Sequence, residues 1–194
     1  YGNLALGMTV STLVNQVVFG PLSNGITRFY APAVESKQFS AFYTSSKKLI
    51  FFATKITLLI LPIGLITLLL INKSQLILIL FVSTFFSIFI GFNGILSGIQ
   101  NAARQRIIVA LHQGLDSWLK FIFGILLIFL LGNTSSSTMI GYAIGAAFVF
   151  ISQYYFFLKI YNFKNVITIT NVDYKKKIWN FSWPFSIFGI FTFF

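Results

Sequence analysis

The sequence contains no cysteine and a single histidine, His112, among its 194 residues. Disulfide bonds and thiolate metal sites are therefore excluded, and one histidine is too few for a histidine-based metal cluster. Carboxylates are almost as scarce, since Glu35, Asp116 and Asp173 are the only three. Paired acid–base catalysis is thereby disfavoured, and no glycine-rich P-loop is present to bind ATP. These absences predict a protein that is not an enzyme and holds no metal or organic cofactor.

Charge of either sign is also scarce. Charged residues make up 9% of the chain, whereas soluble domains carry about 25%, so the polar surface needed to cover a core in water is missing. Apolar residues make up 57%, including 25 phenylalanines, and the mean hydropathy is +0.86. Phenylalanine is favourable at the centre of a bilayer, as leucine is. The composition predicts an all-α, polytopic transmembrane helix bundle.

Several apolar stretches are long enough to cross a bilayer, because about 20 residues of helix span its hydrocarbon core of about 30 Å. We predict five complete spans, at residues 4–29, 49–71, 76–98, 111–131 and 139–158, and the start of a sixth at 178–194. Residues 33–46 are predicted as an interfacial helix or loop, and residues 101–110 as a basic connector. Because the chain lacks an initial Met and stops inside an apolar run, we interpret it as an internal fragment.

Local sequence signals predict a break within the first span and turns between others. The pair Gly20-Pro21 predicts a kink or local unwinding in the first span, because membrane helices tolerate proline where neighbours satisfy the freed carbonyl. The polar segments 72–75 and 132–138 predict turns, and the second offers N-cap residues for the next helix. Asn15 and Gln16 are predicted either to hydrogen-bond between helices or to face a wet cavity.

Small residues four apart occur twice, as Gly94/Gly98 and as Gly141/Gly145. Such GxxxG pairs form a groove that allows a second helix to approach closely. Static packing is the simpler interpretation, and sliding faces in a moving transporter are the functional one.

The basic residues are unevenly distributed over the two sides that alternating spans define. Eleven of the 14 fall on one side: Arg28, Lys37, Lys47, Lys48, Arg104, Arg106, Lys159, Lys164, Lys175, Lys176 and Lys177. Lys73 alone falls on the other. Because lysine and arginine collect in cytoplasmic loops, this side is predicted to be cytoplasmic. The net charge of +11 is therefore interpreted as membrane orientation rather than as a nucleic-acid surface.

Charged residues inside spans are costly and mark candidate functional sites. Arg28 lies near the cytoplasmic end of the first span, where it either anchors the interface or lines a cavity. Lys55 lies about six residues into its span, where its stem allows snorkelling to the interface. The remaining candidates share one helix face. Asp116 and Lys120, four residues apart, suit a local ion pair or a titratable couple. His112, one turn earlier, is either a proton relay or an interfacial residue without a role.

The stretches 20–33 (GPLSNGITRFYAPA) and 100–120 (QNAARQRIIVALHQGLDSWLK), with the hairpin that follows, resemble bacterial polysaccharide biosynthesis proteins. These are the O-antigen-type flippases of the multidrug/oligosaccharidyl-lipid/polysaccharide exporter superfamily. The resemblance implies that residues 1–194 are a fragment of the N-terminal lobe of a two-lobed exporter with 12–14 spans. It also implies a multi-pass protein of the bacterial cytoplasmic membrane.

What the family implies is export of a polyprenyl-linked oligosaccharide by alternating access, with the sugar crossing a central cavity. Membrane lipid and polysaccharide assembly proteins are the implied partners, and the coupling ion, proton or sodium, is left open. Because a diphosphate-linked substrate needs cationic partners, Arg28, Lys55 and Lys120 are the candidates for binding it.

Two other functions remain open. A cation-coupled multidrug antiporter of the same superfamily needs embedded carboxylates, and Asp116 is the only one in the predicted spans. A membrane-embedded polysaccharide polymerase or glycosyltransferase needs a large loop rich in catalytic residues, and no segment between the predicted spans is long enough.

Overall fold

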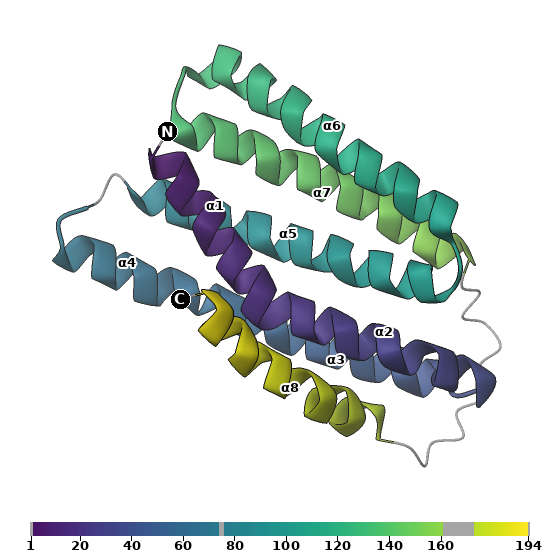
Figure 1. Cartoon of the computed structure of the whole chain (residues 1–194). Helices are drawn as coiled ribbons and strands as arrows, with labels where there is room; N and C mark the ends of the chain where they lie inside the picture. Colours follow the sequence, from purple (N-terminus) through teal and green to yellow (C-terminus); the bar gives the residue numbers. More distant parts are fainter. Residues whose placement is uncertain (1, 74–75, 161–172, 194) are drawn as a thin grey trace.

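The described residues of the computed structural model, 2–73, 76–160 and 173–193, contain helices and turns and no strand (Figure 1). The first membrane-length helix consists of α1 (Gly2–Val14), the π-helical segment η1 (Asn15–Phe19) and α2 (Gly20–Glu35). The second consists of α3 (Phe39–Leu58) and α4 (Ile60–Leu70). There follow α5 (Ile77–Ala102), α6 (Arg106–Leu131), α7 (Ser135–Ile160) and α8 (Tyr174–Phe193).

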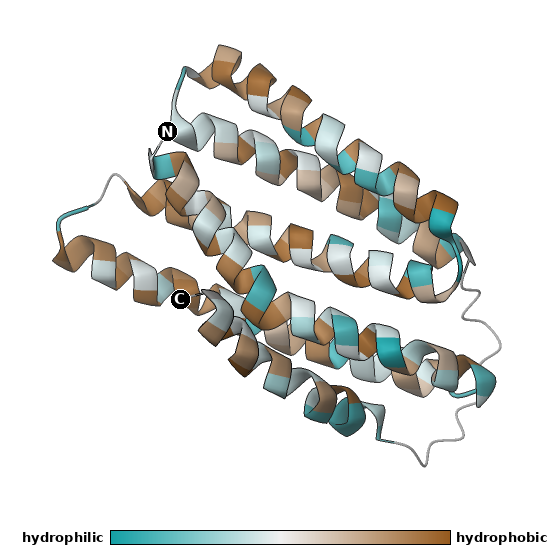
Figure 2. Ribbon diagram, viewed as in Figure 1, coloured by the Kyte–Doolittle hydropathy of each residue, from teal (hydrophilic) through white to brown (hydrophobic). Residues whose placement is uncertain are grey.

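Five helices are long and apolar enough to cross a membrane, as predicted. They are Gly2–Glu35, Phe39–Leu70, Ile77–Ala102, Arg106–Leu131 and Ser135–Lys159. Large apolar side chains cover their outer faces, as with Phe129 on α6, which is 83% exposed. Figure 2 shows hydrophobic residues along α4 and the second half of α6, and hydrophilic ones near the start of α8. Exposure of such apolar faces to water is unfavourable, whereas exposure to the hydrocarbon of a bilayer carries no such penalty.

Two predicted connectors are shorter in the structure than expected, because helices extend into both of them. Residues 33–46 were predicted as an interfacial helix or loop; in the structure α2 runs to Glu35, a turn follows, and the rest is the start of α3, which begins at Phe39. Residues 101–110 were expected to be a connector, but α5 runs to Ala102 and α6 begins at Arg106. Each three-residue turn is a Schellman motif whose central residue has a positive φ, 56° at Lys37 and 62° at Arg104. Since neither residue is glycine, the sequence carries no clear stop signal there.

The predicted irregularity at Gly20-Pro21 is present as the π-helical segment η1. The Gly20 amide bonds to the Asn15 carbonyl, five residues back, and Pro21 follows in the first turn of α2. Both polar side chains of η1 link helices: Asn15 Nδ2 donates to the Ser87 carbonyl of α5 at 3.2 Å, and Gln16 Nε2 donates to Thr192 of α8 at 2.8 Å. They therefore follow the first of the two predicted roles.

Other breaks have equally local causes. Leu59 separates α3 from α4 three residues before Pro62, whose ring excludes the regular bond to the carbonyl of Leu58. Thr134 caps α7, because its Oγ1 accepts the Ser137 amide at 3.1 Å. This cap was predicted within segment 132–138. At the predicted turn 72–75, the structure has a turn at Ile71 and Asn72, and residues 74–75 lie outside the described residues.

The helices form a layered bundle. The α6–α7 hairpin packs on α5, and α5 packs on α1 and α2. Figure 1 shows α3 and α8 along α2, on the far side from α6. A hydrophobic core joins α1, η1, α2, α3, α5, α7 and α8, with Phe19, Phe42 and Phe157 each 1% exposed.

The two GxxxG pairs differ in their surroundings. A Cβ added at Gly141 would lie 2.5 Å from the Phe123 carbonyl oxygen, and one at Gly145 would lie 2.9 Å from the Lys120 amide nitrogen. The backbones of α6 and α7 therefore touch along this pair, as predicted. Gly98 faces Thr27 of α2, but a Cβ at Gly94 would meet nothing within 4 Å.

Candidate functional site

The helix ends that carry most of the basic residues lie on one side of the bundle. In Figure 1 the end of α2, the start of α3, the end of α5, the start of α6 and the end of α7 share this side, together with the start of α8. A partly open cavity of about 210 Å³ lies in this half of the bundle, between α3, α5 and α7.

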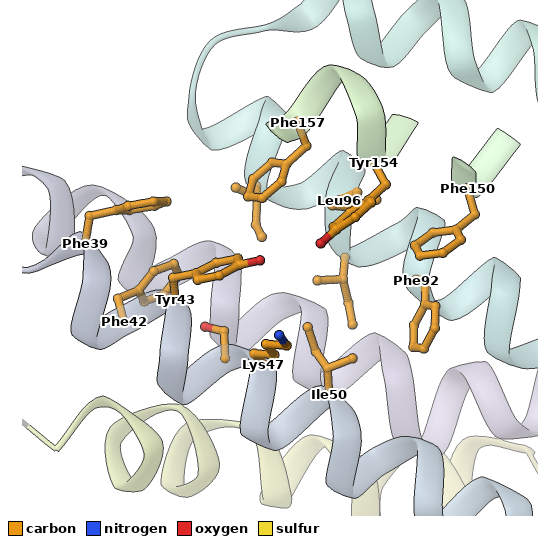
Figure 3. A pocket seen from close by; sticks show the side chains of 13 residues that line it. Phe39, Phe42, Tyr43, Lys47, Ile50, Phe92, Leu96, Phe150, Tyr154 and Phe157 are labelled. Atoms are coloured by element: carbon orange, nitrogen blue, oxygen red, sulfur yellow. The ribbon is translucent and has the colours of Figure 1, made fainter. Parts of the chain in front are cut away.

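The α3 wall of this cavity comes largely from the segment that was predicted as an interfacial helix or loop. Phe39, Tyr43 and Lys47 are spaced four apart, and so are Phe42, Ser46 and Ile50. Because residues four apart lie on the same helix face, both rows point toward α5 and α7. Figure 3 shows the Lys47 ammonium and the Tyr43 ring turned into the cavity.

Aromatic rings make up the wall opposite α3. Phe150, Tyr154 and Phe157 come from α7, and the Tyr43 ring stacks on Phe157 with centroids 6.1 Å apart. Phe92 of α5 contacts Phe150 at 5.2 Å. Aromatic rings bury much area, so this wall presents a broad, flat apolar surface.

Few polar groups reach the cavity, and each is placed differently. Figure 3 shows the hydroxyl oxygens of Tyr43, on α3, and Tyr154, on α7, facing one another across the cavity. Ser46 is 3% exposed, and its Oγ has no hydrogen-bond partner among the described residues. A buried hydroxyl without a partner costs free energy unless a ligand or water satisfies it. The cavity therefore offers flat apolar walls, one cation and a few hydroxyls.

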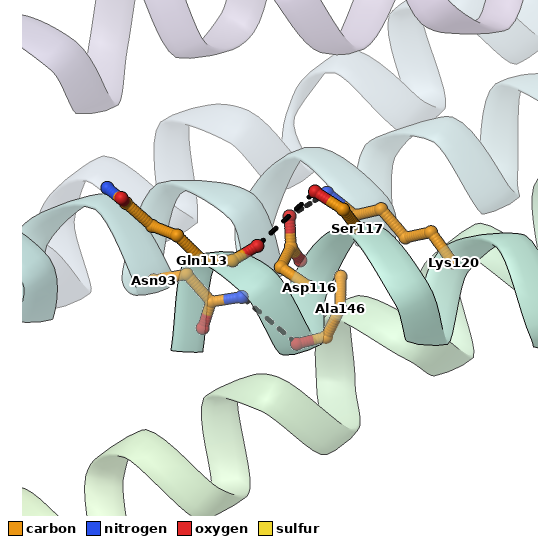
Figure 4. Close-up of polar contacts among 6 residues, drawn as sticks. All are labelled: Asn93, Gln113, Asp116, Ser117, Lys120 and Ala146. Carbon is orange, nitrogen blue, oxygen red and sulfur yellow. Dashed lines mark hydrogen bonds and ion pairs between the residues drawn. The ribbon is translucent and has the colours of Figure 1, made fainter. Parts of the chain in front are cut away.

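Asp116 and Lys120 form the predicted ion pair within α6. Asp116 Oδ2 lies 2.5 Å from Lys120 Nζ, and the two side chains are 28% and 20% exposed (Figure 4). Lys120 also lies over the Phe86 ring at 5.2 Å. The second carboxylate oxygen, Oδ1, is buried without a hydrogen-bond partner among the described residues. Nearby, Asn93 Nδ2 of α5 donates to the Ala146 carbonyl of α7 at 3.1 Å.

His112 links α6 to α7 and is only 4% exposed. Its Nδ1 lies 2.8 Å from the Ile108 carbonyl, which can only accept, so Nδ1 carries the proton of the neutral ring. Nε2 then accepts from the Ser152 hydroxyl at 3.2 Å. With both nitrogens engaged and Asp116 bound to Lys120, the histidine and the carboxylate have separate partners.

The structure disperses the five candidate residues over four places. Arg28 is exposed at the α2–α8 contact, with its guanidinium 4.5 Å from the centre of the Phe181 ring. Lys55 is exposed on α3, 4.6 Å above Phe51. Asp116 and Lys120 pair on α6, and His112 bonds to α7.

Sequence reasoning missed the cavity residues Tyr43, Ser46, Lys47 and Tyr154. A signal for the first three was present, because residues 39, 43 and 47 and residues 42, 46 and 50 form two rows at helical spacing. Tyr154 carries no comparable local signal, since only tertiary packing brings it to α3.

Searches against protein-family models, curated proteins and solved structures found no match. The fold therefore defines the class: an all-helical protein with five helices able to span a membrane, consistent with a multi-pass membrane protein. Groups of three or more residues suited to hold a metal ion are absent from the described part of the chain.

Proposed function

We propose that the protein is a flippase that exports lipid-linked oligosaccharide across the bacterial cytoplasmic membrane by alternating access. The observation that carries the proposal is the aromatic cavity between α3, α5 and α7, with the Lys47 ammonium turned into it. The substrate class comes from the resemblance of residues 20–33 and 100–120 to O-antigen-type flippases.

The chemistry of the cavity fits one end of such a substrate. Sugar rings present apolar C–H faces that pack on aromatic rings, and ligand pockets use a few polar groups to orient what they hold. Lys47 supplies a cation for a phosphate oxygen, and the Ser46 hydroxyl is free to bond. Lys47 thereby replaces the predicted Lys120, whose charge Asp116 already neutralises.

Two breaks within the membrane-length helices support a protein that changes conformation during transport. The first membrane-length helix is interrupted by η1, and the second is interrupted at Leu59. Interrupted helices are typical of transporters, and π-helical segments occur often at functional sites. The break at Leu59 lies beyond Ile50 on α3, and η1 contacts the cavity through Phe19, whose ring lies 5.9 Å from that of Phe92.

Orientation completes the proposal. If the basic side is cytoplasmic, as lysine and arginine counts favour, the cavity opens in the half of the bundle that first meets a substrate made inside the cell. Arg28 and Lys55 remain candidates for guiding the phosphate to it.

The test is complementation of a flippase-deficient bacterial strain with the full-length gene, scored by surface polysaccharide and by accumulation of lipid-linked precursor. We expect the wild-type gene to restore export and Lys47→Ala to reduce it at least tenfold with equal protein in the membrane. Lys73→Ala is the matched control, since Lys73 lies in the turn at the opposite end. Failure of the wild-type gene in membranes that contain the protein, or normal export by Lys47→Ala, would refute the proposal.

The ion pair between Asp116 and Lys120 makes the antiporter alternative less favourable. A cationic drug needs an available carboxylate, whereas the carboxylate of Asp116 is bound to Lys120 within its own helix. Ethidium efflux that depends on Asp116, in cells whose polysaccharide export is unchanged, would favour the antiporter.

A further inference from the structure

We propose that a groove between α3 and α8 binds the phosphate headgroup of an anionic membrane phospholipid. The groove has a volume of about 520 Å³, and its lining includes Lys48, Lys55, Lys175 and Trp179. It is separate from the aromatic cavity, and the inference does not rest on the proposed function.

Helical spacing brings the lysines together. Lys48 and Lys55 are seven residues apart, which is about two turns, so both lie on one face of α3. Lys175 lies in the first turn of α8, and Trp179 follows one turn later on the same face. The helices α3 and α8 pack against each other, and Phe52 meets Trp179 edge-to-face at 5.9 Å.

The charges of this groove are uncompensated. Three ammonium groups line it, and among the described residues no carboxylate does. The ion pair recorded for the described residues, Asp116–Lys120, lies on α6. The acid nearest in sequence, Asp173, uses Oδ1 to cap α8 by accepting the Lys176 amide at 3.2 Å. Like charges gathered in one groove repel, so an anion placed among them is favourable.

The surroundings identify the anion as a lipid phosphate rather than a solute. Trp179 and Phe52 are 45% and 47% exposed, as expected for rings that sit among headgroups at the membrane boundary. Lys55 Nζ lies 4.6 Å above the Phe51 ring, an apolar setting that a lysine stem tolerates while its head reaches the interface. Basic pockets between membrane helices on the cytoplasmic side are known to hold anionic headgroups.

Trp179 is itself a reporter for the test. The full chain, with Trp118→Phe and Trp183→Phe, is reconstituted into phosphatidylcholine bilayers that contain increasing fractions of brominated phosphatidylglycerol. Quenching of Trp179 above that expected from the mole fraction measures preferential binding. Brominated phosphatidylcholine gives the baseline. We expect a preference of at least tenfold for phosphatidylglycerol, since each lysine near the surface contributes about fivefold.

The decisive variant is Lys48→Gln/Lys55→Gln/Lys175→Gln, which should reduce the preference to about one. Its matched control, Lys37→Gln/Lys73→Gln/Lys159→Gln, removes the same charge away from the groove and should keep the preference. Lys55→Gln alone should reduce the preference about fivefold and covers the case in which the triple variant fails to insert.

Three results would overturn the inference. An equal loss in both triple variants would mean that net charge alone attracts the lipid. An unchanged preference in the groove variants would mean that the lysines do not bind it. Complete relief of quenching by millimolar inorganic pyrophosphate would assign the groove to a soluble phosphate instead.

Discussion

The substitution Gly141→Ala should separate α6 from α7 and lower the stability of the bundle. The added Cβ would lie 2.5 Å from the Phe123 carbonyl oxygen and 2.7 Å from the Gly124 Cα, both backbone atoms that no side-chain rotation can move. Ordinary contact begins at 3.4 Å, so the two helices must part by about 1 Å. A gap of that size forfeits about a quarter to a half of each dispersion contact along the seam.

The magnitude follows from how α6 is held. Its contacts are mainly with α7 and only slightly with α5, so the seam is its principal packing surface. Overpacking of this kind costs about 1–3 kcal/mol. At about 2–4 °C per kcal/mol for a chain of this size, a loss of 2 kcal/mol lowers the Tm by about 4–8 °C.

Size-exclusion profiles of detergent-solubilised protein after heating would measure this change in Tm. Gly94→Ala is the matched control, because it also removes the first glycine of a GxxxG pair but meets nothing within 4 Å. It should leave the Tm unchanged or raise it slightly, since alanine favours helix by up to about 1 kcal/mol. Equal loss in the two variants would refute the packing argument.

Further predictions concern three interactions. Gln153→Leu should destabilise the bundle by about 1 kcal/mol, because it removes the 2.9 Å hydrogen bond to Gln100 and leaves the buried side-chain oxygen of Gln100 unpaired. A Tm equal to that of the wild type would contradict this prediction. Asp116→Asn and Lys120→Gln should each lower the Tm more than the double variant does, because each single change leaves one partly buried charge without its partner. Additive losses of Tm in the double-mutant cycle would contradict a stabilising ion pair. Arg104→Gly should stabilise the protein by about 1 kcal/mol, because glycine adopts the positive φ of 62° without the steric cost that arginine bears. Arg104→Ala keeps that cost, so denaturant or thermal unfolding should show no increase in its free energy of unfolding.

The residue pattern was sufficient for the membrane-length helices and their local breaks. Hydropathy and length depend on neighbours in sequence, and so do the unwinding next to Gly20-Pro21, the Thr134 cap and the Asp116–Lys120 pair. Each of these involves residues within about two helical turns of one another. No fold is needed to bring such residues together.

Helix ends were less predictable where the turn chemistry is atypical. Lys37 and Arg104 adopt the left-handed conformation that usually calls for glycine, so the turns that end α2 and α5 carry no glycine signal in the sequence. The tertiary contacts of these helices outweigh the local cost at each turn.

What the tertiary structure alone decided is which faces meet. Two identical GxxxG patterns received different neighbours, a backbone at Gly141 and open space at Gly94. Tyr43 faces Tyr154 across more than 100 residues of chain, and Lys55 and Lys175, separated by a similar span, line one groove. Hydrophobic burial is not directional, so the sequence determines that helices lie in lipid, while shape complementarity between whole helices determines which side chains share a cavity.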